Sequence, residues 1–158
     1  MENAINIAKP SAMQRKFLND SGDLLDLNIP SFRRRYCFFY GTLMDLSTLA
    51  KVLGISYRPT TRPATVTGYK CKLWGQYPAL VDGPPGETVS GVAYEIQSQD
   101  EKTKLETYEG DSYALEGCLI KFEDGSRVLG LTFKWKGDLG VLGNGSFDLR
   151  DWQMRDFA

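Results

Sequence analysis

A series of short segments in which apolar and polar residues alternate constrains the fold of this chain more than any other feature of its sequence. Residues 62–74, 88–96, 118–122 and 129–135 alternate in this way, which is typical of strands that bury one face. Residues 36–40 form a continuous apolar run, which predicts a strand covered on both faces. Residues 77–81 predict a further short strand, and Asp124-Gly125 predicts a hairpin between the last two strands.

Two short helices are predicted between these strands from their capping signals. Asp45 can cap a helix that runs to about residue 53 and ends at Gly54. Ser98 and Glu101 form a capping box that opens a mostly polar helix, for which Gly110 is the natural end. Six strands and two helices predict an α+β fold, a small, mixed, mostly antiparallel β-barrel-like domain. We expect this domain to span residues 34–158, preceded by an N-terminal arm at residues 1–33.

The composition excludes several classes of function. The chain of 158 residues contains no histidine, so Ser-His-Asp and Cys-His catalysis and histidine-ligated zinc are excluded. Nineteen Lys and Arg residues against twenty Asp and Glu residues argue against a nucleic-acid partner. The N-terminal residues contain no apolar signal segment and no run approaches eighteen apolar residues, so we expect a cytoplasmic protein without a membrane partner.

The three cysteines do not form a recognisable metal or redox motif. Cys37, Cys71 and Cys118 are widely spaced and contain no C-x-x-C pair, so no metal site is predicted. They can be small buried side chains in a reducing compartment, or one of them can be a nucleophile.

Two places in the chain could carry chemistry. At residues 40–43 a buried strand ends in Gly41 before a helix start, where unpaired backbone N–H groups can bind a carboxylate or an oxyanion, although many such junctions bind nothing. Glu109 lies in the last turn of the second helix, where the helix dipole and apolar neighbours would raise the pKa of its carboxyl group toward that of a general acid/base. The alternative is that Glu106 and Glu109 are both ordinary solvated glutamates.

Four motifs, taken in order, resemble the gamma-glutamylcyclotransferase-like family, in particular its branch of avirulence-induced-gene-like small proteins. They are FFYGTLMD at residues 38–45, YPALV at 77–81, SGVAYEI at 90–96 and L-x-x-Y-E-G-x-x-Y at 105–113. The resemblance covers roughly residues 36–135 and implies a small β-barrel-like α+β fold. This chain departs from the family pattern at Ala114 and Leu115, where many relatives carry an arginine or another polar residue.

The resemblance also implies an activity and a set of site residues. The activity is the cyclisation of a γ-glutamyl amine or amino acid to 5-oxoproline with release of the amine, without a cofactor. Glu109 would be the general acid/base, and Tyr40, Gly41, Thr42 and Leu43 would bind the glutamyl part of the substrate. We expect Tyr77 and Tyr113 to complete the substrate-binding residues by bounding the pocket. Two alternatives stay open: an enzyme of the same fold that transfers a proton on a specialised metabolite, and a module that binds a small carboxylate without turnover.

Overall fold

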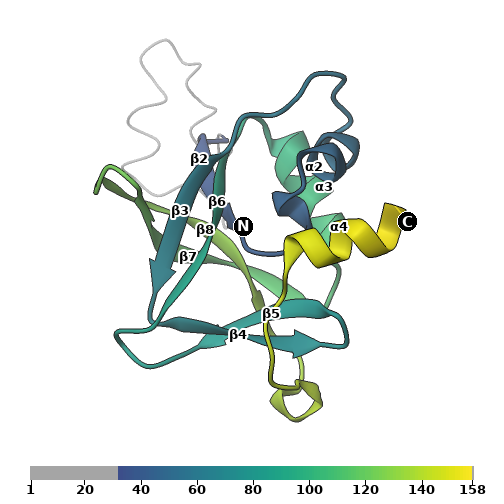
Figure 1. Ribbon diagram of the computed structural model, residues 1–158. Helices are drawn as coiled ribbons and strands as arrows, with labels where there is room; N and C mark the ends of the chain where they lie inside the picture. The colour runs from purple at the N-terminus through teal and green to yellow at the C-terminus, as the bar shows by residue number, and fades with distance from the viewer. Residues whose placement is uncertain (1–31, 158) are drawn as a thin grey trace, which may run out of the picture. The chain divides into compact units, whose positions relative to one another are not determined.

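The computed structural model describes residues 32–157, and five strands in this range close into a barrel. Around the barrel their order is β2 (Arg35–Phe39), β6 (Thr88–Ile96), β3 (Arg62–Thr67), β7 (Tyr113–Phe122) and β8 (Arg127–Trp135). Four of the pairings are antiparallel, and β2 closes the barrel by pairing in parallel with β8. The predicted α+β barrel fold is therefore confirmed (Figure 1). The predicted arm at residues 1–33 lies almost entirely outside the described residues.

The interior of the barrel is filled by the apolar residues that alternate along its strands. Every second residue points inward, as strand geometry requires. From the barrel strands the buried cluster contains Phe38, Ala64, Val66, Ala93, Cys118, Ile120 and Phe122. Tyr40, which follows β2, and Leu80, which lies outside the five barrel strands, complete it. At Gly91 a Cβ atom would lie 2.1 Å from the Phe39 carbonyl oxygen, so β2 and β6 can approach this closely only with glycine there.

The segment at residues 62–74, predicted as one strand, is two strands. Gly68, with φ +91°, separates β3 from β4 (Tyr69–Trp74) and lets the chain leave the barrel. Strand β4 pairs with β5 (Tyr77–Asp82) in a two-stranded hairpin, which is seen below the barrel in Figure 1. The described residues thus contain seven strands instead of six, because a positive φ at one glycine interrupts a continuous alternating pattern.

The two predicted helices are present. A short 3-10 turn, η2 (Thr42–Met44), leads into α2 (Leu46–Leu53), which Asp45 caps by accepting a hydrogen bond from the Thr48 backbone N–H at 2.9 Å. Helix α3 (Gln99–Glu109) begins after Ser98 and ends at Gly110. Both helices lie beside the β2 and β6 side of the barrel (Figure 1).

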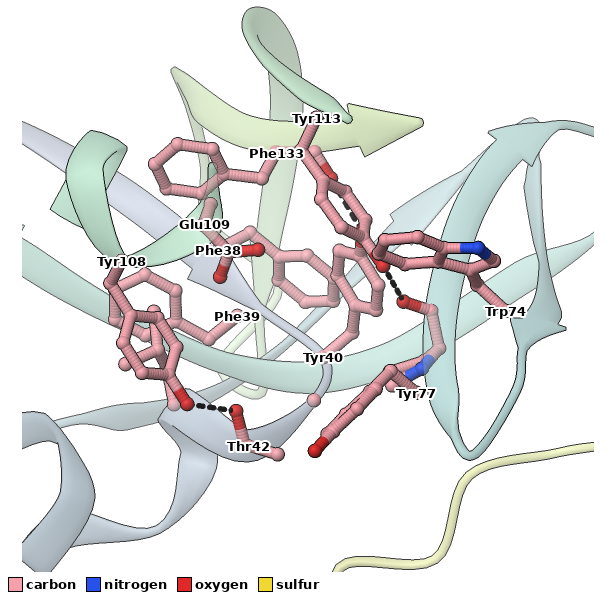
Figure 2. Close-up of a pocket in the computed structure, with 13 residues that line it drawn as sticks. Phe38, Phe39, Tyr40, Thr42, Trp74, Tyr77, Tyr108, Glu109, Tyr113 and Phe133 are labelled. Atoms are coloured by element: carbon pink, nitrogen blue, oxygen red, sulfur yellow. Dashed lines mark hydrogen bonds between the residues drawn. The ribbon is translucent and has the colours of Figure 1, made fainter. Parts of the chain in front are cut away.

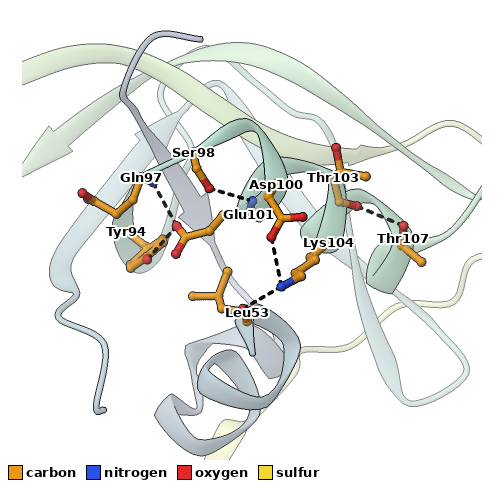
Figure 3. A network of polar contacts seen from close by, with 9 residues as sticks. All are labelled: Leu53, Tyr94, Gln97, Ser98, Asp100, Glu101, Thr103, Lys104 and Thr107. Atoms are coloured by element: carbon orange, nitrogen blue, oxygen red, sulfur yellow. Dashed lines mark hydrogen bonds and ion pairs between the residues drawn. The ribbon is translucent and has the colours of Figure 1, made fainter. Parts of the chain in front are cut away.

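The polar network at the start of α3 only partly follows the predicted capping box. The Ser98 hydroxyl accepts from the Glu101 N–H at 3.1 Å, as expected. The Glu101 carboxylate, however, accepts from the Gln97 N–H and the Tyr94 hydroxyl, each at 2.9 Å (Figure 3). The buried Glu101 thereby joins α3 to the end of β6, so it is a structural residue.

Two further elements were not predicted. The glycine-rich stretch after β8 contains a short 3-10 turn, η3 (Leu139–Val141), and its Gly143 forms a β-bridge with Leu73. Helix α4 (Leu149–Phe157) follows, and its Gln153 amide donates to Asp45 at 2.6 Å. No helix among residues 32–157 is both long and apolar enough to cross a membrane.

Candidate active site

The candidate site begins where β2 ends and the chain turns into η2. Gly41 lies against the hairpin, and a Cβ atom at this position would be 2.7 Å from Pro78 Cγ, so a larger residue would push the turn away from β5. The N–H groups of Gly41, Thr42 and Leu43 form no hydrogen bond with any of the residues that the structure describes. Three backbone donors of residues that line the cavity described below are thus left without a partner in the described part of the chain.

Glu109 reaches the same place from the last turn of α3. Its half-buried carboxyl group forms no hydrogen bond or ion pair within residues 32–157. Burial without a compensating partner disfavours the carboxylate and raises the pKa of Glu109 from 4.5 to about 7. The group can therefore accept and return a proton near neutral pH.

The turn and Glu109 border one cavity of about 300 Å³. Figure 2 shows the Glu109 carboxyl group directed into a space surrounded by aromatic rings. All seven residues predicted as catalytic or substrate-binding line this cavity, although they come from four separate segments of the chain. The complete lining is Phe38, Phe39, Tyr40, Gly41, Thr42, Leu43, Trp74, Tyr77, Pro78, Tyr108, Glu109, Tyr113 and Phe133.

Two of the predicted binding tyrosines use their hydroxyl protons inside the protein. The Tyr40 hydroxyl donates to the Phe133 carbonyl at 2.5 Å and accepts from the Leu80 N–H at 3.2 Å. The Tyr113 hydroxyl donates to the Pro78 carbonyl at 2.8 Å. Burial, with a further contribution from the Glu109 charge, raises the pKa of both phenols, so both stay protonated. A ligand would therefore meet these two residues mainly through their rings.

Sequence reasoning missed six residues of the lining, of which Tyr108 and Trp74 matter most here. The Tyr108 hydroxyl lies 2.7 Å from Thr42 Oγ1, so this bond ties the end of α3 to the η2 turn (Figure 2). The position of Tyr108 next to Glu109 in the Y-E-G motif was a signal that could have identified it. Trp74 ends β4, and nothing in the local sequence distinguishes it from a buried core tryptophan.

Neither the cysteines nor a cluster of acidic residues contributes to this cavity. Cys37 and Cys118 are buried and Cys71 is half-buried, and none of the three lines the cavity. Burial raises the pKa of all three thiols, which keeps them protonated and argues against the nucleophile alternative. Within the described residues, no three His, Cys, Asp or Glu side chains come together as a metal site would require.

Comparison with protein families gives a match over residues 37–154 to the family described as gamma-glutamyl cyclotransferase, AIG2-like. The match covers the barrel except for the first two residues of β2, together with the hairpin and all the residues of the cavity. The chain belongs to this family. The resemblance inferred from the four short motifs is thus confirmed, and the match continues into α4, beyond the motifs.

Solved structures share the fold of this AIG2-like chain. Two Arabidopsis thaliana proteins determined in solution are each 24% identical to it, with TM-scores of 0.63 and 0.61. The alignments cover 80% and 81% of this chain and 77% and 86% of those proteins. A yeast γ-glutamyl cyclotransferase specific to glutathione is 13% identical, with a TM-score of 0.54, over 66% of this chain and 69% of that one. The search of curated proteins gives no match.

Proposed function

We propose that this AIG2-like protein cyclises a γ-glutamyl amine or γ-glutamyl amino acid to 5-oxoproline and releases the amine, with Glu109 as the general acid/base. The observation that carries this proposal is the Glu109 carboxyl group itself. It lines an aromatic cavity, it has no ion-pair partner among the described residues, and its pKa of about 7 suits proton transfer at neutral pH. Membership of the family supports the same chemistry.

The reaction needs no nucleophile from the protein, because the substrate supplies its own. The Glu109 carboxylate accepts a proton from the α-ammonium group of the substrate, and the free amine attacks the γ-carbonyl carbon. The new C–N bond closes a five-membered ring, and the original amide C–N bond breaks. Two protons leave the attacking nitrogen and two reach the departing nitrogen, so a single carboxyl group that shuttles between the two atoms suffices. This scheme agrees with the absence of histidine from the chain.

The turn after β2 would hold the glutamyl part of the substrate. The unused N–H groups of Gly41, Thr42 and Leu43 are suited to the substrate α-carboxylate or to the oxyanion that develops on the γ-carbonyl, and one such donor is worth about 10²–10³ in rate. Holding the substrate folded for ring closure adds several kcal/mol through orientation alone. The bond between Thr42 and Tyr108 would keep this turn in position relative to Glu109.

The test is 5-oxoproline release from a panel of γ-glutamyl amines, γ-glutamyl amino acids and glutathione, assayed with the wild type, Glu109→Gln and Glu106→Gln. Gln is nearly isosteric with Glu but cannot carry the proton, so we expect Glu109→Gln to lower turnover by roughly 10²–10⁴ while the protein stays folded. Glu106 lies exposed on the same helix, so Glu106→Gln is the matched control and should keep full activity. Equal turnover by folded Glu109→Gln and wild type would refute the assignment. A substrate that binds but is never converted would instead indicate the binding module.

A further inference from the structure

The tip of the β4–β5 hairpin places two aromatic rings at the mouth of the cavity. Trp74 and Tyr77 are directly opposite each other in the register, with only Gly75 and Gln76 in the turn between them. Side chains opposite each other in an antiparallel pair point to the same face. Both residues line the cavity, and 41% of Trp74 and 43% of Tyr77 remain exposed to solvent. Apolar surface is therefore left open in the cavity that Glu109 also lines.

The two rings differ in how firmly they are held. The Trp74 ring packs on Trp135, with centroids 4.9 Å apart, and against Tyr113 at 6.3 Å. The Tyr77 side chain makes no ring contact or hydrogen bond with the residues of the described range. Figure 2 shows the Tyr77 ring on the far side of the cavity from Glu109 and Phe133, below Trp74. The packed indole of Trp74 and the phenol of Tyr77, which has no ring contact of its own in the described range, together suit a flat apolar group of a ligand.

The charges around the cavity disfavour a leaving group that carries a carboxylate of its own. None of the thirteen lining residues is Lys or Arg. Lys134, which follows the lining residue Phe133, is paired with Asp82 at 2.7 Å and with Glu116 at 3.9 Å. The η2 turn offers its N–H groups to one carboxylate, that of the glutamyl part. A second carboxylate, on the leaving group of an amino acid conjugate, would find no cation in the lining.

We propose that Trp74 and Tyr77 form the leaving-group subsite and that this subsite selects γ-glutamyl conjugates of arylalkylamines that carry no charged group besides the amine. This inference rests on the proposed cyclisation for its chemistry: the amide C–N bond breaks, and the arylalkylamine leaves from between the two rings. Burial of the exposed faces of Trp74 and Tyr77 by the aromatic group supplies the selectivity.

Four substrates test the subsite by kcat/KM: the γ-glutamyl conjugates of phenethylamine, ethylamine, phenylalanine and cadaverine. The wild type should prefer the phenethylamine conjugate over the ethylamine conjugate by about tenfold, in keeping with an aromatic contact. In Tyr77→Ala and Trp74→Leu this preference should fall to about threefold or less. Tyr77→Ala removes a half-exposed ring that makes no ring contact or hydrogen bond within residues 32–157, so it is the variant least prone to misfolding. Tyr57→Ala is the control, because Tyr57 is 62% exposed and does not line this cavity. It should keep the preference.

Equal use of the phenethylamine and ethylamine conjugates, a preference for the phenylalanine or cadaverine conjugate, or an unchanged preference in Tyr77→Ala would overturn the inference. If none of the conjugates is converted, the proposed cyclisation is refuted. Calorimetric measurement of how tightly Glu109→Gln binds each conjugate then tests the subsite independently of the reaction. Tighter binding of the phenethylamine conjugate than of the ethylamine conjugate, lost in Tyr77→Ala, would support the subsite without the reaction. Equal binding of both, or binding of neither, would refute it.

Discussion

The burial of Glu109 should make the stability of the protein depend on pH in a way that Glu109→Gln abolishes. The pKa of this carboxyl group is about 7 in the folded protein against an ordinary 4.5, so the folded state binds the proton more tightly than the unfolded state. Between these two pH values the free energy of unfolding therefore falls as the pH rises. At about 1.4 kcal/mol for each pH unit, the total contribution of this group is about 3 kcal/mol. It is present below pH 4.5 and has been lost once the pH has passed 7.

The amide of Glu109→Gln does not ionise, so the free energy of unfolding of this variant does not fall between pH 4.5 and 7 on account of this side chain. We therefore expect the variant and the wild type to be about equally stable at pH 4.5, and the variant to be more stable by up to about 3 kcal/mol at pH 8.5. Urea denaturation of both proteins at the two pH values measures this difference, with Glu106→Gln as the exposed control that should track the wild type. The same stability difference at both pH values would refute the raised pKa. If Glu109→Gln removed the pH dependence of stability but left turnover unchanged, the raised pKa of Glu109 would stand and its proposed role in catalysis would be refuted.

Two further predictions concern the framework that holds the site. Gly91→Ala should lower the free energy of unfolding by at least about 2 kcal/mol, because the new Cβ would lie 2.1 Å from the Phe39 carbonyl oxygen. Gly86→Ala is the control, because a Cβ there would have no atom within 4 Å. Equal urea midpoints for the two variants would contradict this prediction. Asp45→Ala should cost about 1–2 kcal/mol, because the carboxylate accepts bonds from the Thr48 N–H at 2.9 Å and hydroxyl at 2.7 Å. Asp45→Asn retains a side-chain acceptor and should lose less stability than Asp45→Ala. Equal losses of the two variants in thermal unfolding would show that the capping hydrogen bonds do not stabilise the helix.

Local chemistry allowed the sequence to predict several elements correctly. Helix α3 starts at a hydroxyl cap and ends at Gly110, and these signals act within a few residues, so they can be read without the fold. The same holds for the Asp45 cap of α2 and for the hairpin at Asp124 and Gly125. The division of residues 62–74 at Gly68 was missed, because the alternating pattern continues across it and a positive φ is not visible in the sequence. Helix α4 was missed because it has little apolar periodicity of its own.

The candidate site illustrates the same distinction. Short motifs identified the turn at residues 40–43 and Glu109 as places where chemistry could occur, since each motif is a local arrangement of a strand end or a helix end. The sequence could not indicate that Trp74 lies at the same cavity, because it belongs to a hairpin outside the barrel. Nor could it indicate that the hydroxyls of Tyr40 and Tyr113 are already bonded to backbone carbonyls far along the chain.

By itself, the sequence determined most of the strands, the ends of α2 and α3, the absence of histidine chemistry and the family resemblance, all of which depend on neighbouring residues or on composition. Only the tertiary structure decided that Glu109 is half-buried and without a cation partner among residues 32–157, and that two hairpin aromatics border its cavity. Closure of the barrel through the parallel pairing of β2 with β8 joins segments about ninety residues apart, such as Phe38 and Thr132. The helix end already predicted that the pKa of Glu109 is raised, but its value of about 7 comes from burial, which depends on contacts between segments far apart in the chain.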